Sequence, residues 1–75
     1  MRTKGKGHRF DYLFRRLDEI TNKLELNIDD EEAYNELVSL HREASEKECF
    51  SDYEEHDRLN ILNTCNWWFR AIKNW

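Results

Sequence analysis

The chain has 75 residues, a formal net charge of −4 and no proline, and both of its glycines lie in the first seven residues. This length allows one small domain, and a 39% hydrophobic fraction beside a 37% charged fraction requires nearly every large apolar side chain for the core. No apolar run is long enough for a signal peptide or a membrane-spanning helix. Two cysteines without a metal-binding or redox spacing then predict a cytoplasmic protein with reduced thiols.

The distribution of glycine and proline determines the fold class. From His8 onward, no residue forces a helix to break or supplies the tight turn of a β-hairpin. We therefore expect an all-α fold, a small three-helix bundle made of an antiparallel helical hairpin and a longer C-terminal helix. Residues 1–8 are expected to form a flexible basic tail, and residues 9–75 a single helical domain.

The charges are strongly segregated along the chain. Residues 25–57 contain thirteen acids and only two bases, whereas residues 58–75 contain three bases and no acid. The first nine residues carry four cations and no acid: Arg2, Lys4, Lys6 and Arg9. These four are candidate nucleic-acid contacts, because such a tail attracts phosphate in a salt-dependent way. The charge of −8 on the rest of the chain opposes that attraction.

The first helix is expected over about residues 9–26. Its apolar residues fall on one arc of a 3.6-residue wheel: Phe10, Leu13, Phe14, Leu17, Ile20 and Leu24. Asn27 is expected to end this helix in the left-handed conformation.

The second helix is expected over about residues 29–48. Asp29 and Glu32 have the spacing of a capping box, and Ile28 and Ala33 occupy the positions of a hydrophobic staple. A connection of about three residues makes this helix an antiparallel neighbour of the first. Its inner face is predicted to hold Ala33, Tyr34, Leu37, Val38, Leu40, His41 and Ala44.

The third helix is expected over about residues 52–74, after a second capping box at Ser51 and Glu54. Because this helix is longer than the other two, its C-terminal turns are expected to extend beyond the hairpin. Its apolar arc comprises Ile61, Leu62, Cys65, Trp68, Phe69, Ile72 and Trp75. Ile61, Trp68 and Trp75 recur at intervals of seven, a seam suited to helix packing.

Trp67 lies away from this arc, beside asparagines, and a regular helix would turn it outward. Partial cover by a neighbouring element is one interpretation. A second is an anchor at a protein interface, where tryptophan often dominates the binding energy. A third is a helix that frays near its C-terminal end. The predicted partner-binding residues are Trp67, Trp68, Phe69, Arg70 and Trp75.

The acids of the middle region form a predicted acidic face. It consists of Asp30, Glu31, Glu32, Glu36, Glu43, Glu46, Asp52, Glu54 and Glu55. A solvated face that keeps a small bundle soluble is the simpler interpretation. The alternative is a surface that imitates nucleic-acid phosphates and occupies the basic cleft of a nuclease, polymerase or repressor.

Catalytic and metal-binding motifs are missing from the sequence. It has no glycine-rich phosphate loop, no nucleophile elbow and no Cys–His pair of a known catalytic spacing. Asp52 and His56 lie one helical turn apart, but they leave a tetrahedral metal site two ligands short. His41 on the inner face is most simply a hydrogen-bonded histidine at the core edge. We expect a protein that is not an enzyme and uses neither cofactor nor metal.

The sequence therefore favours a protein-binding module that acts as a stoichiometric inhibitor or adaptor. In size, acidity and lack of catalytic motifs it is similar in general character to phage or plasmid accessory proteins that block a host enzyme or defence complex. Two alternatives stay open. One is a self-associating dimer through the seam of Ile61, Trp68 and Trp75. The other is a nucleic-acid-binding protein that uses the basic tail and the polar side of the third helix.

Overall fold

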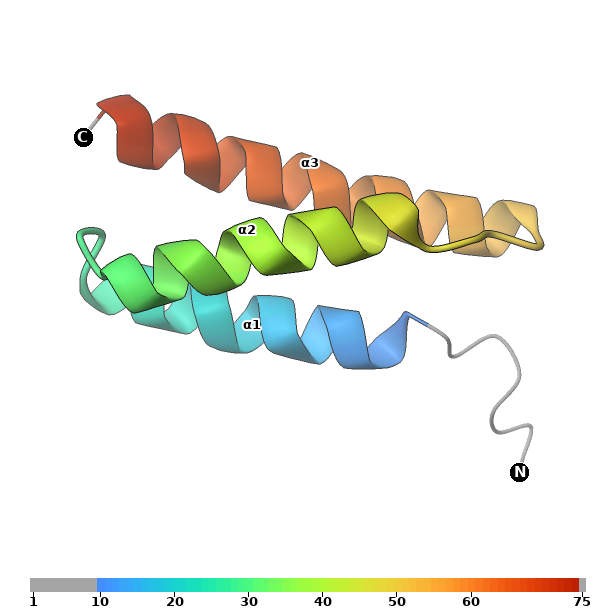
Figure 1. Ribbon diagram of the computed structural model, residues 1–75, viewed down its shortest axis with the longest axis horizontal. Coiled ribbons are helices and arrows are strands. Elements are labelled where there is room, and N and C mark those ends of the chain that lie inside the picture. The colour runs from blue at the N-terminus through green and yellow to red at the C-terminus, as the bar shows by residue number, and fades with distance from the viewer. Residues whose placement is uncertain (1–9, 75) are drawn as a thin grey trace.

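The computed structural model describes residues 10–74, which form three α-helices. α1 spans Asp11–Leu26, α2 spans Glu31–Glu46 and α3 spans Asp52–Asn74. α1 and α2 form an antiparallel hairpin, and α3 packs against both (Figure 1), so the predicted all-α three-helix bundle is confirmed. The predicted tail, residues 1–8, lies outside the described residues.

The bundle has two distinct ends (Figure 1). At the tip end, residues 27–30 join α1 to α2, and the C-terminal end of α3 lies beside this loop. At the connection end, residues 47–51 join α2 to the start of α3.

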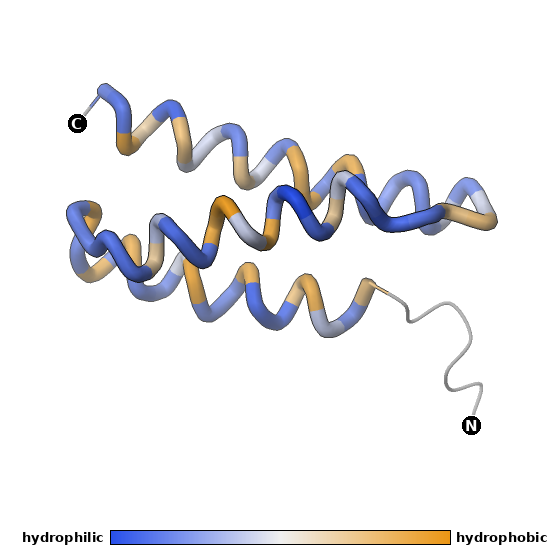
Figure 2. Tube along the Cα trace, viewed as in Figure 1, coloured by the Kyte–Doolittle hydropathy of each residue, from blue (hydrophilic) through white to orange (hydrophobic). Residues whose placement is uncertain are grey.

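The core lies mainly between α1 and α2. Apolar and hydrophilic positions alternate with a helical period along all three helices (Figure 2), as amphipathic packing requires. α1 and α2 supply most of the buried apolar side chains, whereas α3 supplies Ile61 and Cys65. The buried residues of the hairpin are Phe10, Leu13, Leu17, Ile20, Leu24, Ala33, Leu37, Leu40 and Ala44. These positions match the predicted inner arcs, except that Phe14 and His41 are only partly buried and that Tyr34 and Val38 of the predicted α2 face are exposed.

α3 is packed less deeply than its sequence suggests. Four residues of its predicted apolar arc are only partly buried against the core: Leu62, Trp68, Phe69 and Ile72. The shallow packing leaves part of their apolar surface in contact with water near the tip end.

The start of α2 differs from the prediction by one residue. The carboxylate of Asp30, not Asp29, caps the helix by accepting a hydrogen bond from the Ala33 amide at 3.1 Å. Asn27 is extended rather than left-handed (φ −154°, ψ 101°). Its side chain accepts a hydrogen bond from the Asp29 amide. Asp29 is therefore part of a side-chain turn that precedes the helix, and the capping position falls on the next residue, Asp30. The predicted Asp29 capping box and the Ile28–Ala33 staple are therefore wrong.

The start of α3 agrees with the predicted capping box, with one change. The hydroxyl of Ser51 accepts from the Glu54 amide at 3.3 Å. The carboxylate of Glu54 accepts from the amide of Phe50, at 2.6 Å, rather than from Ser51. Glu54 is only 6% exposed, so its assignment to the acidic face is wrong.

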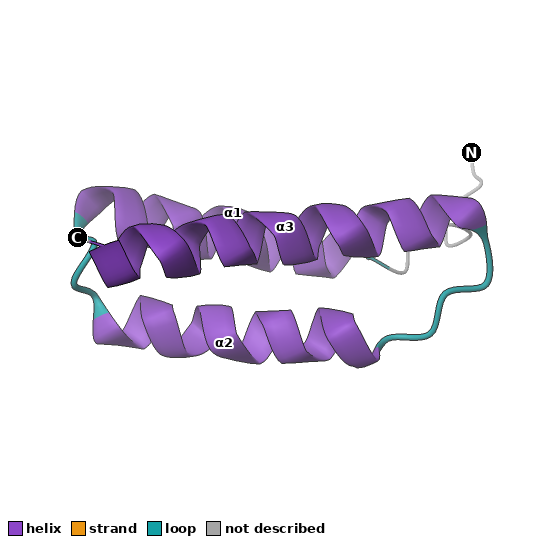
Figure 3. Cartoon of the chain, turned by 90° about the horizontal axis from the view of Figure 1, so that it is seen from above, coloured by secondary structure: helices purple, strands orange, loops and turns teal. Residues whose placement is uncertain are grey.

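The extra length of α3 lies at the connection end, not at the C-terminal end as expected. The first turns of α3 extend beyond the end of α2, whereas its last turn stops level with the tip end (Figure 1). Residues 47–51 run outward to the start of α3 (Figure 3). Arg58 supports this course by donating a hydrogen bond to the Lys47 carbonyl at 3.4 Å. Along residues 10–74, no helix has the combination of length and apolar character needed to cross a membrane.

Candidate protein-binding surface at the tip end

Trp67 lies on the outer side of α3, as its position in the sequence predicts. Its side chain is 62% exposed. The indole ring meets the half-buried ring of Trp68 edge to face, with 4.9 Å between centroids and an interplanar angle of 84°. This contact fixes the orientation of an aromatic ring that remains largely in water.

A groove opens beside Trp67 at the tip end, with a volume of about 500 Å³. We call it the Trp67 groove. The end of α1 forms its opposite wall, where Leu26 is 89% exposed. The lining residues are Leu24, Glu25, Leu26, Asn27, Ile28, Asp29, Trp67, Trp68 and Ala71. The fold thus places two large exposed apolar side chains, 41 residues apart in sequence, in one depression.

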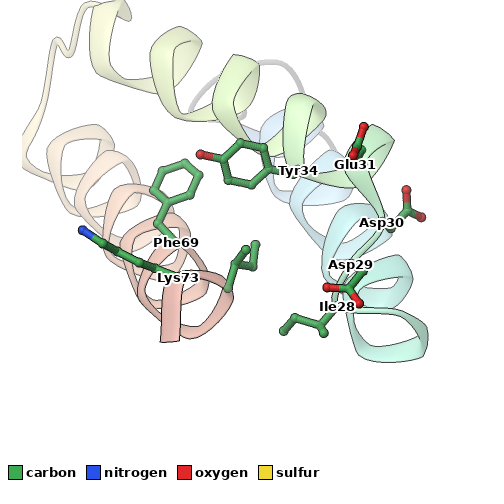
Figure 4. Close-up of a pocket in the computed structure, with 8 residues that line it drawn as sticks. Ile28, Asp29, Asp30, Glu31, Tyr34, Phe69 and Lys73 are labelled. Carbon is green, nitrogen blue, oxygen red and sulfur yellow. The ribbon is translucent and has the colours of Figure 1, made fainter. Parts of the chain in front are cut away.

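A second groove, of about 770 Å³, lies between the start of α2 and the end of α3. We call it the Phe69 groove. The ring of Phe69 contacts Tyr34 edge to face at 5.9 Å and His41 at 5.6 Å. Figure 4 shows the rings of Tyr34 and Phe69 on one side of the groove and the loop that carries Asp29 and Asp30 on the other. The lining residues are Ile28, Asp29, Asp30, Glu31, Tyr34, Phe69, Ile72 and Lys73.

The structure brings part of the predicted partner-binding set together. Trp67 and Trp68 line one groove and Phe69 lines the other. Arg70 is exposed but lines neither groove, and Trp75 lies outside the described residues.

Sequence reasoning missed Leu26 and Ile28. Leu26 lies two residues after Leu24 and hence off the inner arc of the first helix. An apolar residue out of helical phase is the same signal that identified Trp67, and it was available at this position.

The predicted acidic face divides into acids used by the fold and acids left on the surface. Glu36 pairs with Lys23 at 3.4 Å, and Glu43 accepts hydrogen bonds from Tyr12 at 2.5 Å and Arg16 at 2.7 Å. Three of the other predicted acids also have internal roles, with Asp30 and Glu54 at helix starts and Glu55 paired with Arg58 at 2.7 Å. The exposed members are Glu31, Glu32, Glu46 and Asp52.

These internal contacts lower the pKa of two of the carboxylates. The hydrogen bond from Tyr12, with further help from Arg16, lowers the pKa of Glu43 although desolvation opposes it. The guanidinium of Arg58 lowers the pKa of Glu55 in the same way. A charged Glu43 or Glu55 therefore already has its counterion within the chain.

The acids at the tip end have a different environment. Five acids occur within eight residues: Glu25, Asp29, Asp30, Glu31 and Glu32. Among the described residues, Asp29, Glu31 and Glu32 form no ion pair. Their charge adjoins both grooves, because Asp29 lines each of them.

The other sites considered from the sequence are less well assembled. Within residues 10–74, no three His, Cys, Asp or Glu side chains gather where a metal ion would bind. Both cysteines are free, and burial raises the pKa of Cys65 to about 11. Desolvation also raises the pKa of Cys49. Neither thiol has the lowered pKa of an activated nucleophile.

The structure also bears on the two alternative interpretations, nucleic-acid binding and self-association. The candidate nucleic-acid contacts Arg2, Lys4, Lys6 and Arg9 lie outside the described residues. Ile61, the first residue of the predicted dimer seam, is fully buried inside one chain. A second copy therefore has no access to it while the bundle is folded.

Comparison with known proteins gives no further guidance, because no protein-family model, curated protein or solved structure matches this chain.

Proposed function

We propose that this chain is a non-catalytic protein-binding module, a stoichiometric inhibitor or adaptor that holds its partner at the tip end. The observation that carries the proposal is the Trp67 groove, in which Trp67 and Leu26 are both largely exposed. Burying an apolar side chain of this size in an interface contributes on the order of 2 kcal/mol to binding.

The composition of the surface favours a protein partner. Tryptophan is enriched among the few interface residues that dominate affinity, particularly in a depression that excludes water. The edge contact with Trp68 holds the Trp67 ring in place before binding. A preorganised ring loses less conformational entropy on association than a mobile one.

The charge around the groove favours a basic surface on that partner. Five acids in residues 25–32 would accelerate association with a positively charged cleft and orient the chain on it. This supports the interpretation as a mimic of nucleic-acid phosphates, now centred on the tip end rather than spread along α2. An accessory protein of phage or plasmid type that occupies the cleft of a nucleic-acid enzyme has these properties, and we propose the cytoplasm as its location.

Partner capture with matched variants tests this proposal. Immobilised wild-type chain, Trp67→Ala, Leu26→Ala and Tyr53→Ala are compared for the proteins they retain from the same lysate. Tyr53 is the control because its ring is 83% exposed on the same helix but lies at the connection end. We expect Trp67→Ala and Leu26→Ala to lose a retained protein that Tyr53→Ala keeps.

A photo-crosslinking amino acid at position 67 should then join the chain to that same protein, whereas one at position 53 should not. Equal retention by all four chains would contradict the proposal. Light scattering on the purified chain separates the alternative of self-association. A dimer that Trp67→Ala converts to a monomer would assign the Trp67 groove to a second copy.

A further inference from the structure

The Phe69 groove combines apolar walls with a charged rim. Tyr34 and Phe69 meet edge to face along one wall, with Ile28 and Ile72 also lining the groove. Asp29 and Glu31 are exposed at its border. An apolar depression edged by charge of one sign selects a ligand that has both an apolar side chain and the opposite charge.

The negative rim is not neutralised by the lysine that lines the groove. Lys73 lines the same groove, but its side chain points away from Asp29 and Glu31 (Figure 4). Asp29 and Glu31 have no ion-pair partner among the described residues. A cation from another molecule would find both carboxylates available.

The position of the groove would let a helix pack against two neighbours at once. It lies between the first turn of α2 and the last turns of α3, two helices that run in opposite directions (Figure 1). A short helix in such a position would pack against both, in the way that amphipathic helices occupy grooves between helices.

We propose that the Phe69 groove binds a short cationic amphipathic helix of the partner protein. An apolar side chain of that helix enters between Tyr34, Phe69 and Ile72, and a lysine or arginine one turn away lies against Asp29 and Glu31. The inference rests on the proposed function, since it takes the tip end as the partner site, and it adds the chemistry of the segment that is recognised.

The acids of the first turn of α2 also have an internal role, because negative charge there favours the helix dipole. Glu31 and Glu32 share this role and are both exposed, but only Glu31 lines the groove. Glu31→Lys and Glu32→Lys make the same change of charge at adjacent positions. Any difference between them therefore reports the groove and not the net charge.

The probe is a displayed library of helical peptides about 14 residues long. Apolar anchors are placed at i, i+3, i+4 and i+7, and the other positions are drawn equally from Lys, Glu, Gln and Ala. The library is selected on the full chain, and the affinity of the best peptide is measured by fluorescence anisotropy. We expect lysine to exceed glutamate in the selected peptides.

The variants then locate the bound peptide. We expect Glu31→Lys and Phe69→Ala each to weaken it by about tenfold or more, and Glu32→Lys by less than about threefold. Thermal melting of each variant verifies that it is folded, and Glu31→Lys tests the site even where Phe69→Ala is unstable.

Several outcomes would overturn the inference. Selected peptides without excess lysine, or equal losses with Glu31→Lys and Glu32→Lys, would show that the groove does not recognise a cation. Binding that Trp67→Ala abolishes and Glu31→Lys leaves intact would place the peptide in the Trp67 groove, so that the proposed function survives and this inference fails. A library that yields no binder would count against both.

Discussion

The two ends of the bundle use their polar and aromatic side chains differently. At the connection end several of these groups bind other parts of the same chain, although the rings of Phe50 and Tyr53 are exposed there as well. Glu43 accepts hydrogen bonds from Tyr12 and Arg16 of α1. The ammonium of Lys47 lies over the rings of Phe10 and Tyr12, at 5.8 and 5.4 Å from their centroids.

At the tip end, comparable groups face water. Trp67 and Leu26 are exposed beside one groove, and Asp29 and Glu31 border the other without an internal ion pair among the described residues. The difference between these groups teaches that Glu43 and Lys47 contribute to folding, whereas the groove residues of the tip end retain unused binding capacity. Substitutions should therefore affect stability mainly at the connection end and in the core, and binding mainly at the tip end.

The largest expected effect compares two isoleucines of α3. Ile61→Ala should lower the free energy of unfolding by about 2–5 kcal/mol, because the side chain is fully buried and its loss leaves a cavity. Ile72→Ala, at the half-buried border of the Phe69 groove, should cost clearly less. Urea denaturation followed by circular dichroism measures both. Equal losses would show that the tip end is packed as firmly as the middle of the bundle.

A smaller effect is expected at the start of α3. Glu54→Ala should destabilise the chain by about 1–3 kcal/mol, because the start of α3 loses a buried carboxylate and the amide of Phe50 loses its acceptor. Glu54→Gln keeps an acceptor oxygen and should retain most of the stability. Glu46→Ala, at an exposed acid of α2, is the control and should change the midpoint of urea denaturation very little. If Glu54→Ala were as stable as this control, the hydrogen bond of Glu54 would not contribute to the stability of the connection between α2 and α3.

The contribution of the Tyr12–Glu43 hydrogen bond to stability should depend on pH. The Tyr12 hydrogen bond lowers the pKa of Glu43, and the same bond raises the pKa of Tyr12. Because the pKa of Glu43 is lowered in the folded chain, its hydrogen bond contributes full stability above the ordinary carboxyl pKa. This stability is lost as the pH falls through the lowered pKa. Because the pKa of Tyr12 is raised, the same hydrogen bond contributes full stability below the ordinary phenol pKa. This stability is lost as the pH rises through the raised pKa.

Wild type should therefore exceed Tyr12→Phe in stability most clearly between about pH 4.3 and pH 10, the ordinary values for Glu and Tyr. The gap should narrow on both sides of this plateau. Thermal melts of the two chains across pH measure it. A gap that persists unchanged at pH 3 would show that the hydrogen bond does not depend on the charge of Glu43.

The smallest expected effect on stability is at the tip end. Leu26→Ala should change the free energy of unfolding by no more than about 0.5 kcal/mol, because the side chain is largely exposed. Trp67→Ala should cost about 0.5–1.5 kcal/mol, because the exposed ring also loses its edge contact with Trp68. Thermal melting monitored by circular dichroism is sufficient. A large loss from Leu26→Ala would mean that this side chain supports the fold, and the comparison between the two ends would fail there.

The helices themselves follow from local properties of the sequence. The period of the apolar residues placed most of the inner arcs of α1 and α2 correctly, with Tyr34 and Val38 as exceptions, and the capping residue Ser51 marked the start of α3. The outward position of Trp67 also follows from helical phase alone. These features need only the geometry of one helix, so no knowledge of its neighbours is required.

The tertiary structure decided the features that depend on two or more helices. The pairing of Glu43 with α1, the direction in which α3 extends and the meeting of Leu26 with Trp67 in one groove belong to this group. Each depends on the axial shift and rotation of one helix against another. Helical periodicity shows which face of a helix is buried, but it does not determine how far the helix slides along its neighbour. The candidate binding surface is thus a product of packing, assembled from residues that the sequence keeps far apart.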